Sequence, residues 1–226
     1  MNEVQIIARR GNKGRLAAQA ARLALLLLFL SGCSLGATLP AQTAAPSTSA
    51  SLPLESTHTP SESPLPACTS PAALTPALTE GPYYTPNSPE RLSLLEDSLT
   101  GTVLVLSGYV LTPDCQPVAH AWLDFWQADA NGVYDNSGYT LRGHQFTDEN
   151  GYYQLTTVVP GIYPGRTEHI HFKAQAPEKP VLTSQLFFPG VTQNSGDSIF
   201  DPALVITITG QGSDTIEATF NFIVNP

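Results

Sequence analysis

Basic residues are scarce in this chain of 226 residues. It has 10 lysines and arginines against 19 aspartates and glutamates, a formal net charge of −9. Five of the ten basic residues lie within residues 1–33, so the rest of the chain is still more acidic. An acidic surface of this size repels phosphate backbones and anionic lipid head groups. We therefore expect no nucleic acid partner.

Long hydrophobic runs are absent as well. The longest, LALLLLFL at residues 23–30, is too short to span a bilayer as a helix. It follows a basic segment and precedes small residues, which is the pattern of a signal peptide. The run ends in LSGC, which resembles the lipobox of bacterial lipoproteins and makes Cys33 the lipidated residue. An ordinary secretory cleavage site, or a short membrane anchor with a chance cysteine, is the alternative.

These features predict a signal peptide over residues 1–33 and an exported protein on the outer face of a bacterial membrane, attached through lipid alone. Residues 34–66 are rich in Ser, Thr, Pro and Ala and show no apolar periodicity. Such a segment cannot bury enough surface to fold, so we expect a disordered tether there. The folded domain is expected over residues 67–226.

Cysteine is scarce too, with 3 residues in the chain, which makes a structural zinc site improbable. Once Cys33 is lipidated, Cys68 and Cys115 remain as an even pair. In an exported chain such a pair usually closes a disulfide. It would tie the start of the domain to the turn TPDCQP. Two free buried thiols are the alternative.

From residue 100 onward, short apolar-rich runs alternate with turn sequences such as DANG, DENG and GQGSD. Seven runs favour β-branched or aromatic residues: 102–111, 119–126, 152–159, 169–176, 183–188, 203–209 and 215–224. This spacing predicts an all-β fold, an antiparallel β-sandwich of about seven to nine strands. Helical signal is weak, and residues 88–97, SPERLSLLED, are its best candidate.

The stretch PGIYPGRTEHIHF, residues 160–172, places Tyr163 six positions before the first of two histidines, His169 and His171. On a strand, residues i and i+2 share a face, with their Cα atoms roughly 7 Å apart. That arrangement suits two ligands of one metal ion. Two surface or hydrogen-bonded histidines are the alternative interpretation.

A tyrosine beside two histidines indicates which metal. Phenolate is a hard, anionic ligand that favours a trivalent ion. A tyrosine has a pKa of about 10, and only a strongly acidic metal removes its proton easily. Tyr163, His169 and His171 therefore predict Fe(III). The candidate for a second phenolate is Tyr134 in QADANGVYDNSG, whose alternative role is packing over a glycine turn.

The chain resembles the catalytic domain of intradiol ring-cleavage dioxygenases, which are non-haem ferric enzymes that open catechols between their two hydroxyl carbons. The resemblance covers most of residues 68–190. It lies in residues 126–176, WQADANGVYDNSGYTLRGHQFTDENGYYQLTTVVPGIYPGRTEHIHFKAQA, in EGPYY at 80–84 and in LTSQLFFPG at 182–190.

The resemblance implies a role for each matching residue. The four implied iron ligands are Tyr134, Tyr163, His169 and His171. Substrate would displace Tyr163, Arg166 would lie near the ring that is attacked, and Gln185 would assist it. A segment that lines the substrate pocket in some members is matched by Gly81, Pro82 and Tyr83.

With these roles, the chain would be an oxidoreductase that adds both atoms of O2 to a catechol-type diol and forms a muconate-type dicarboxylic acid. The displaced Tyr163 would accept a substrate proton, and Arg166 would stabilise negative charge on the ring. A surface binding module with a vestigial iron site is one alternative. A ferric-catecholate binder without turnover is another.

The sequence differs from the catechol enzymes of this family in two respects. A signal and tether stand where those enzymes have a helical dimerisation region, and the spacing from Tyr163 to Arg166 is short. The sequence therefore leaves open whether the chain forms a homo-oligomer. Cations for an anionic substrate are few in the mature chain: Arg91, Arg142, Arg166, Lys173 and Lys179. We therefore expect uncharged catechols to react better than protocatechuate.

Overall fold

The computed structural model describes residues 68–226. The predicted signal peptide, the lipidation site Cys33 and the tether at 34–66 lie outside the described residues. Within 68–226, no helix has the length and apolar character needed to cross a membrane.

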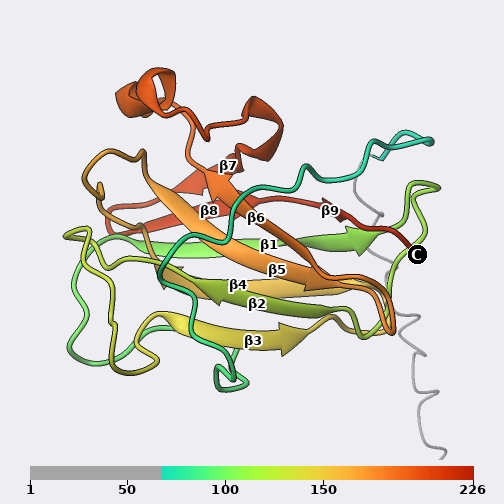
Figure 1. Cartoon of the computed structure of the whole chain (residues 1–226), viewed down its shortest axis with the longest axis horizontal. Helices are drawn as coiled ribbons and strands as arrows, with labels where there is room; N and C mark the ends of the chain where they lie inside the picture. The colour runs from blue at the N-terminus through green and yellow to red at the C-terminus, as the bar shows by residue number, and fades with distance from the viewer. Residues whose placement is uncertain (1–67) are drawn as a thin grey trace, which may run out of the picture. The chain divides into compact units, whose positions relative to one another are not determined.

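Nine strands form two sheets (Figure 1). The four-stranded sheet has the order β3 (Arg142–Phe146), β2 (Trp122–Trp126), β5 (His169–Gln175) and β6 (Leu182–Phe187). The five-stranded sheet has the order β4 (Tyr152–Val158), β1 (Val103–Leu111), β8 (Thr215–Thr219) and β7 (Thr207–Gln211), and β9 (Phe222–Ile223) pairs with β1. Two short 3-10 helices, η1 (Thr192–Gly196) and η2 (Pro202–Leu204), lie between β6 and β7. The predicted all-β sandwich of seven to nine strands is confirmed.

The strand directions show one difference from the sequence prediction. Every pairing of the four-stranded sheet is antiparallel, but β1 runs parallel to both β8 and β9. The run at 215–224, expected as one strand, is divided between β8 and β9. No hairpin joins these strands to β1, so turn geometry does not impose antiparallel pairing on them.

Two local predictions were wrong. Residues 88–97 are not helical; they are extended and form single bridges from Glu90 to His144 and from Ser93 to Thr156. Leu94 is fully buried in the core, which provides the tertiary contact that outweighs a weak helical pattern. The strand β3, with the sequence RGHQF, was missed because it lacks an alternation of apolar residues.

The core lies between the inner faces of the two sheets. From β1 it receives Leu104, Leu106 and Val110, and from β5 it receives Ile170 and Phe172. Both sets follow the period of two that places alternate side chains on one face of a strand. The outward side chains of the two strands therefore face away from this core.

A disulfide joins Cys68 and Cys115, whose Cα atoms are 5.8 Å apart. Cys115 lies in the turn that follows β1, and the two cysteines are separated by 47 positions in the sequence. The bond therefore ties the first described residues to the five-stranded sheet.

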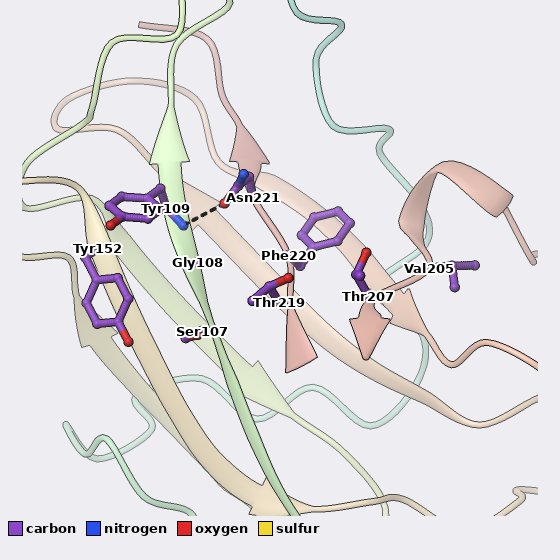
Figure 2. A pocket seen from close by; sticks show the side chains of 9 residues that line it. All are labelled: Ser107, Gly108, Tyr109, Tyr152, Val205, Thr207, Thr219, Phe220 and Asn221. Atoms are coloured by element: carbon purple, nitrogen blue, oxygen red, sulfur yellow. Dashed lines mark hydrogen bonds between the residues drawn. The ribbon is translucent and has the colours of Figure 1, made fainter. Parts of the chain in front are cut away.

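The five-stranded sheet has a cavity of about 340 Å³ (Figure 2). Its lining comes from Ser107, Gly108, Tyr109, Tyr152, Val205, Thr207, Thr219, Phe220 and Asn221. The amide of Tyr109 donates a hydrogen bond to Oδ1 of Asn221 at 3.1 Å. The lining contains no carboxylate, imidazole, lysine or arginine, so the predicted metal chemistry lies elsewhere.

Candidate metal centre

Strand β5 buries ionisable side chains on the face opposite the core. His169, His171 and Lys173 alternate with Ile170 and Phe172 and are 4%, 2% and 9% exposed. In the register of the sheet, His171 is paired with Trp126 on β2 and with Gln185 on β6. Three adjacent strands thus bring these side chains to one place on the outer face.

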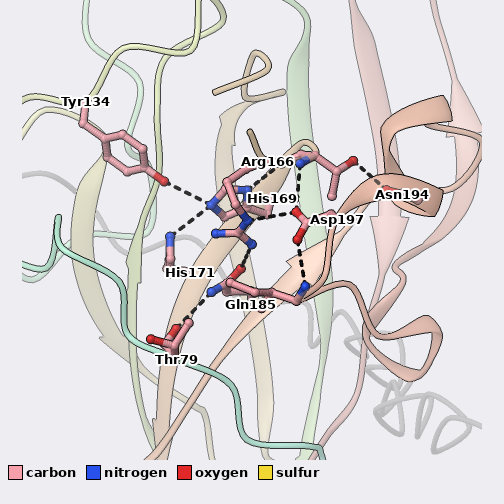
Figure 3. A network of polar contacts seen from close by, with 10 residues as sticks. Thr79, Tyr134, Arg166, His169, His171, Gln185, Asn194 and Asp197 are labelled. Atoms are coloured by element: carbon pink, nitrogen blue, oxygen red, sulfur yellow. Dashed lines mark hydrogen bonds and ion pairs between the residues drawn. The ribbon is translucent and has the colours of Figure 1, made fainter. Parts of the chain in front are cut away.

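The two imidazoles converge with a phenol (Figure 3). The Nε2 atoms of His169 and His171 are 3.1 Å apart, and the hydroxyl of Tyr134 is 3.3 Å from Nε2 of His169. Nδ1 of His169 donates to the carbonyl oxygen of Thr167 at 2.6 Å. This bond holds the proton of the neutral ring on Nδ1 and leaves Nε2 with a free lone pair.

Both histidines are neutral at physiological pH. Burial lowers the pKa of His169 to about 4. Burial also lowers the pKa of His171 well below its usual value, and the neighbouring His169 adds to this effect. Nδ1 of His171 is buried and has no hydrogen-bond partner among the described residues. Neutral imidazoles with buried nitrogens suit metal binding, which requires an unprotonated ring.

Three tyrosines pack together beside the histidines. The ring of Tyr83 stacks on that of Tyr134 with centroids 4.3 Å apart, and the ring of Tyr163 meets both edge-on. The hydroxyls of Tyr83 and Tyr163 are 2.8 Å apart. Burial raises the pKa of Tyr134, and the hydrogen bond to Tyr163 raises that of Tyr83. The phenols of Tyr134 and Tyr83 therefore stay protonated unless a strong Lewis acid binds them.

The segment at residues 79–84 crosses the site. Gly81 has φ of +73°, and a Cβ atom there would lie 3.2 Å from Cε1 of His171. Both the backbone conformation and the close approach favour glycine. The carbonyl of Thr79 accepts a hydrogen bond from Nε2 of Gln185 at 2.9 Å. Of the three residues predicted to line a pocket, Gly81 and Tyr83 contact the site, whereas Pro82 is exposed.

Arg166 and Gln185, predicted from the resemblance to act together, are in direct contact. Nη2 of Arg166 donates to Oε1 of Gln185 at 2.5 Å, and Nε of Arg166 donates to Oδ2 of Asp197 at 2.9 Å. A cavity of about 250 Å³ adjoins Arg166 and Asp197. Its lining residues are Ile162, Gly165, Arg166, Gln193, Gly196 and Asp197.

The other cations near the site are engaged. Arg142 is 1% exposed and donates to the carbonyl oxygens of Tyr83 and Asp135 at 2.5 and 2.6 Å. It therefore holds the backbone of two segments. Lys173 pairs with Glu80 at 2.6 Å, and its Nζ lies 4.4 Å from the centre of the Tyr84 ring.

Sequence reasoning missed several parts of the site. Trp126 stacks on the ring of His171 with centroids 4.9 Å apart and an interplanar angle of 12°. The period of two from His169 through His171 to Lys173 could have placed that lysine on the same face. Asp197 lies in a loop with no motif, so no local signal marked it.

The donor set itself indicates the kind of metal. Residues 68–226 contain no group of three or more His, Cys, Asp and Glu side chains that could hold a metal ion. The oxygen donor beside Nε2 of His169 is the hydroxyl of Tyr134. Metal–nitrogen bonds are about 2.1 Å long, so two ligands at a right angle are about 3.0 Å apart. The spacings of 3.1 and 3.3 Å fit one ion held by both histidines and Tyr134.

Comparison with known proteins decides the family. The family model described as "Dioxygenase" matches residues 79–226, well over half of the chain. The chain belongs to the intradiol ring-cleavage dioxygenase family. Members of this family use non-haem iron.

Curated intradiol dioxygenases match part of their length. The chain is 27% identical to the catechol 1,2-dioxygenase of Acinetobacter baylyi, over 51% of this chain and 47% of that relative. It is 28% identical to the 6-chlorohydroxyquinol 1,2-dioxygenase of Cupriavidus pinatubonensis, over 70% of this chain and 65% of that relative. The chain thus spans about half to two thirds of the curated intradiol dioxygenases that it matches.

Two solved dioxygenase structures match over nearly their whole length. The dioxygenase domain of a dioxygenase carbohydrate-binding protein fusion from Streptomyces sp. SirexAA-E is 51% identical, with a TM-score of 0.66, over 68% of this chain and 99% of that one. An intradiol ring-cleavage dioxygenase from Tetranychus urticae is 28% identical, with a TM-score of 0.63, over 69% of this chain and 96% of that one.

Proposed function

We propose that this chain is an Fe(III)-dependent dioxygenase that cleaves a catechol-type diol between its hydroxyl carbons, using O2, to a muconate-type dicarboxylic acid. The observation that carries the proposal is that Nε2 of His169 lies 3.3 Å from the Tyr134 hydroxyl and 3.1 Å from Nε2 of His171. Two neutral nitrogens and a phenol form a donor set for a hard, trivalent ion.

The ligands of the iron would be Tyr134, Tyr163, His169 and His171. When bound, the ferric ion supplies the Lewis acidity that keeps phenolate ligands and a chelating catecholate deprotonated near neutral pH.

Tyr163 provides a base for the substrate. Its hydroxyl lies 2.8 Å from that of Tyr83, so a hydrogen-bond partner is in place when substrate releases the Tyr163 oxygen. The released oxygen takes the proton of one substrate hydroxyl. The Tyr83 hydroxyl would remain available to this oxygen as a hydrogen-bond partner.

Arg166 provides a fixed positive charge. Its side chain is 16% exposed, and Gln185 and Asp197 hold its guanidinium from two sides. A guanidinium stays charged at all physiological pH values. A preorganised cation in a largely buried site stabilises negative charge that develops on the substrate ring during oxygen attack.

The charges around the site favour an uncharged catechol. Arg166 is paired with Asp197, Lys173 is paired with Glu80, and Arg142 is bonded to carbonyl oxygens. A carboxylate on the substrate ring would lose its hydration without gaining a free cation in return. Catechol and its alkyl- or hydroxyl-substituted derivatives should therefore have a higher kcat/KM than protocatechuate. Oxygen-electrode assays at two ionic strengths test this, and a preference for protocatechuate at both would contradict it.

The protein would act outside the cytoplasm, attached through a lipid on Cys33. The LSGC sequence after an apolar run supports this, and a Cys68–Cys115 disulfide suits an oxidising compartment. Cys33→Ser should release the protein from the membrane fraction or leave an unprocessed precursor. Unchanged membrane association, with no lipid detected by mass spectrometry, would contradict the anchor.

The iron and the chemistry can be tested on the purified protein. We expect one iron per chain, a visible phenolate-to-iron charge-transfer band, and a change of that band when catechol is added under nitrogen. Admission of ¹⁸O2 should give a dicarboxylic acid that contains both labelled atoms. Zinc in a colourless protein would refute the metal assignment. A catechol-dependent spectral change without oxygen uptake would instead favour the ferric-catecholate binder.

A further inference from the structure

Asp197 is a buried carboxylate that no motif explains. It follows η1, and its side chain is 2% exposed. Oδ2 accepts hydrogen bonds from Nε of Arg166 and from the amide of Thr167, both at 2.9 Å. Oδ1 accepts from the amide of Ile199 at 2.9 Å. One carboxylate therefore connects three separate backbone and side-chain donors.

The contact with Arg166 restrains the guanidinium. Nε is bonded to Asp197 and Nη2 to Gln185, so two of its three nitrogens are held by different segments of the chain. The Arg166 side chain is 16% exposed, and a largely buried cation requires a compensating charge. Asp197 supplies that charge in direct contact and fixes the direction of the guanidinium.

Through Thr167, Asp197 is also connected to His169. The amide of Thr167 donates to Asp197, and its carbonyl accepts from Nδ1 of His169 at 2.6 Å. The hydroxyl of Thr167 also lies 2.6 Å from Oδ1 of Asn194, in η1. Partners of this kind set the tautomer and orientation of a metal-binding histidine.

We propose that Asp197 is a positioning residue that sets the Arg166 guanidinium through a direct ion pair and the His169 ring through the Thr167 peptide. The proposal rests on the proposed function. Asp197 acts on the reaction through these two groups, and its loss should alter oxygen chemistry and iron retention together.

The test uses Asp197→Asn in the full-length, iron-loaded protein. Asparagine keeps one accepting oxygen, but its NH2 group would meet the N–H donors that bond to the other oxygen of Asp197. We expect kcat for catechol to fall about 10- to 100-fold, with KM changed less than about threefold, and Fe(III) transfer to EDTA to become about 10-fold faster. Asp197→Glu keeps the carboxylate and should restore part of the kcat and part of the iron retention. Asp201→Asn is the matched control, because the Asp201 side chain accepts a hydrogen bond from the amide of Ala203, at the start of η2, and lies outside the Arg166 and His169 contacts.

A second pair of variants separates the effect of Asp197 on Arg166 from its effect on His169. Arg166→Gln removes the guanidinium, so adding Asp197→Asn to it should lower kcat little further while still accelerating iron release. If Asp197→Asn alone does not fold, this double variant, which lacks both buried charges, is compared with Arg166→Gln for iron release. Equal release rates there, or wild-type kcat and iron release in Asp197→Asn, would overturn the proposal. A wild-type protein without iron or oxygen uptake would instead refute the proposed function.

Discussion

Strands β1 and β5 are both interior strands of their sheets, yet they are buried differently. Along β1 the buried positions alternate with half-buried ones up to its last two residues, whereas the first six residues of β5 are all buried. Both strands direct one face into the same core. The outer face of β5 is covered by residues 79–84, which contact His171, Lys173 and Gln185. The additional burial of β5 relative to β1 thus comes from the site on its outer face, because both strands share the core.

This difference has an energetic meaning. Burial of an ionisable side chain costs free energy unless partners compensate it. On β5, Lys173 has Glu80 as its partner and His169 has the Thr167 carbonyl. The outer face of β1 carries side chains such as Ser107 and Tyr109, which are half-buried. Of these two outer faces, the β5 face therefore carries the free-energy cost of buried ionisable groups. A bound metal would offset part of that cost.

The largest expected effect comes from removing a ligand on the β5 side. His169→Ala or Tyr134→Phe should abolish the visible colour and reduce bound iron and oxygen uptake to near zero, because each removes a donor from the convergent set. Metal analysis and circular dichroism check that iron is lost while the fold is kept. Ser107→Ala, on the outer face of β1, is the control and should retain full iron. Retention of iron in His169→Ala would show that the ion lies elsewhere.

Arg166→Ala should leave the iron in place and slow the reaction. We expect kcat to fall by about 10² or more, the usual loss when one electrostatic stabiliser is removed. Steady-state oxygen uptake, together with the spectrum of the catechol complex under nitrogen, separates turnover from binding. Lys179→Ala removes an exposed cation and should change neither quantity. Unchanged turnover in Arg166→Ala would exclude this role for the arginine.

A glycine pair tests the segment that covers β5. Gly81 and Gly190 have φ of +73° and +76°, but only Gly81 has a ring within 4 Å of its would-be Cβ. Both alanine substitutions should destabilise the fold by about 1 kcal/mol or more through backbone strain. Gly81→Ala should also weaken iron binding about 10-fold, because it displaces His171. Chelator competition and thermal melting measure the two effects, and equal iron affinities would contradict the contact.

The smallest effect at neutral pH is expected for the stability of the metal-free protein. Its free energy of unfolding should depend on pH through His169. Burial lowers the pKa of His169 from its ordinary value of 6.5 to about 4. Below about pH 6.5 the unfolded chain therefore binds a proton that the folded chain refuses, so stability falls as the pH drops toward 4. This loss amounts to about 3 kcal/mol. Denaturant titrations should show a shallower dependence for His169→Gln, and identical slopes would mean that His169 is not the group responsible.

Much of the site could be predicted from residues close in the sequence. The period of two placed His169 and His171 on one face, and the structure brings Tyr134, Arg166 and Gln185 to the same place. The prediction failed where distant contacts decide the local structure. Leu94 is held in the core from an extended segment instead of a helix, and β3 forms between β2 and residues 88–91 without an apolar pattern of its own.

The sequence by itself determined the all-β class and the chemistry of the site, because alternation and ligand type are properties of neighbouring residues. Only the tertiary structure decided which groups support that chemistry. Asp197 reaches Arg166 across 31 positions, and Glu80 reaches Lys173 across 93. The stacking of Trp126 on His171 likewise depends on the register between β2 and β5. Such contacts arise when packing closes long loops, and no local pattern of residues encodes which partners will meet.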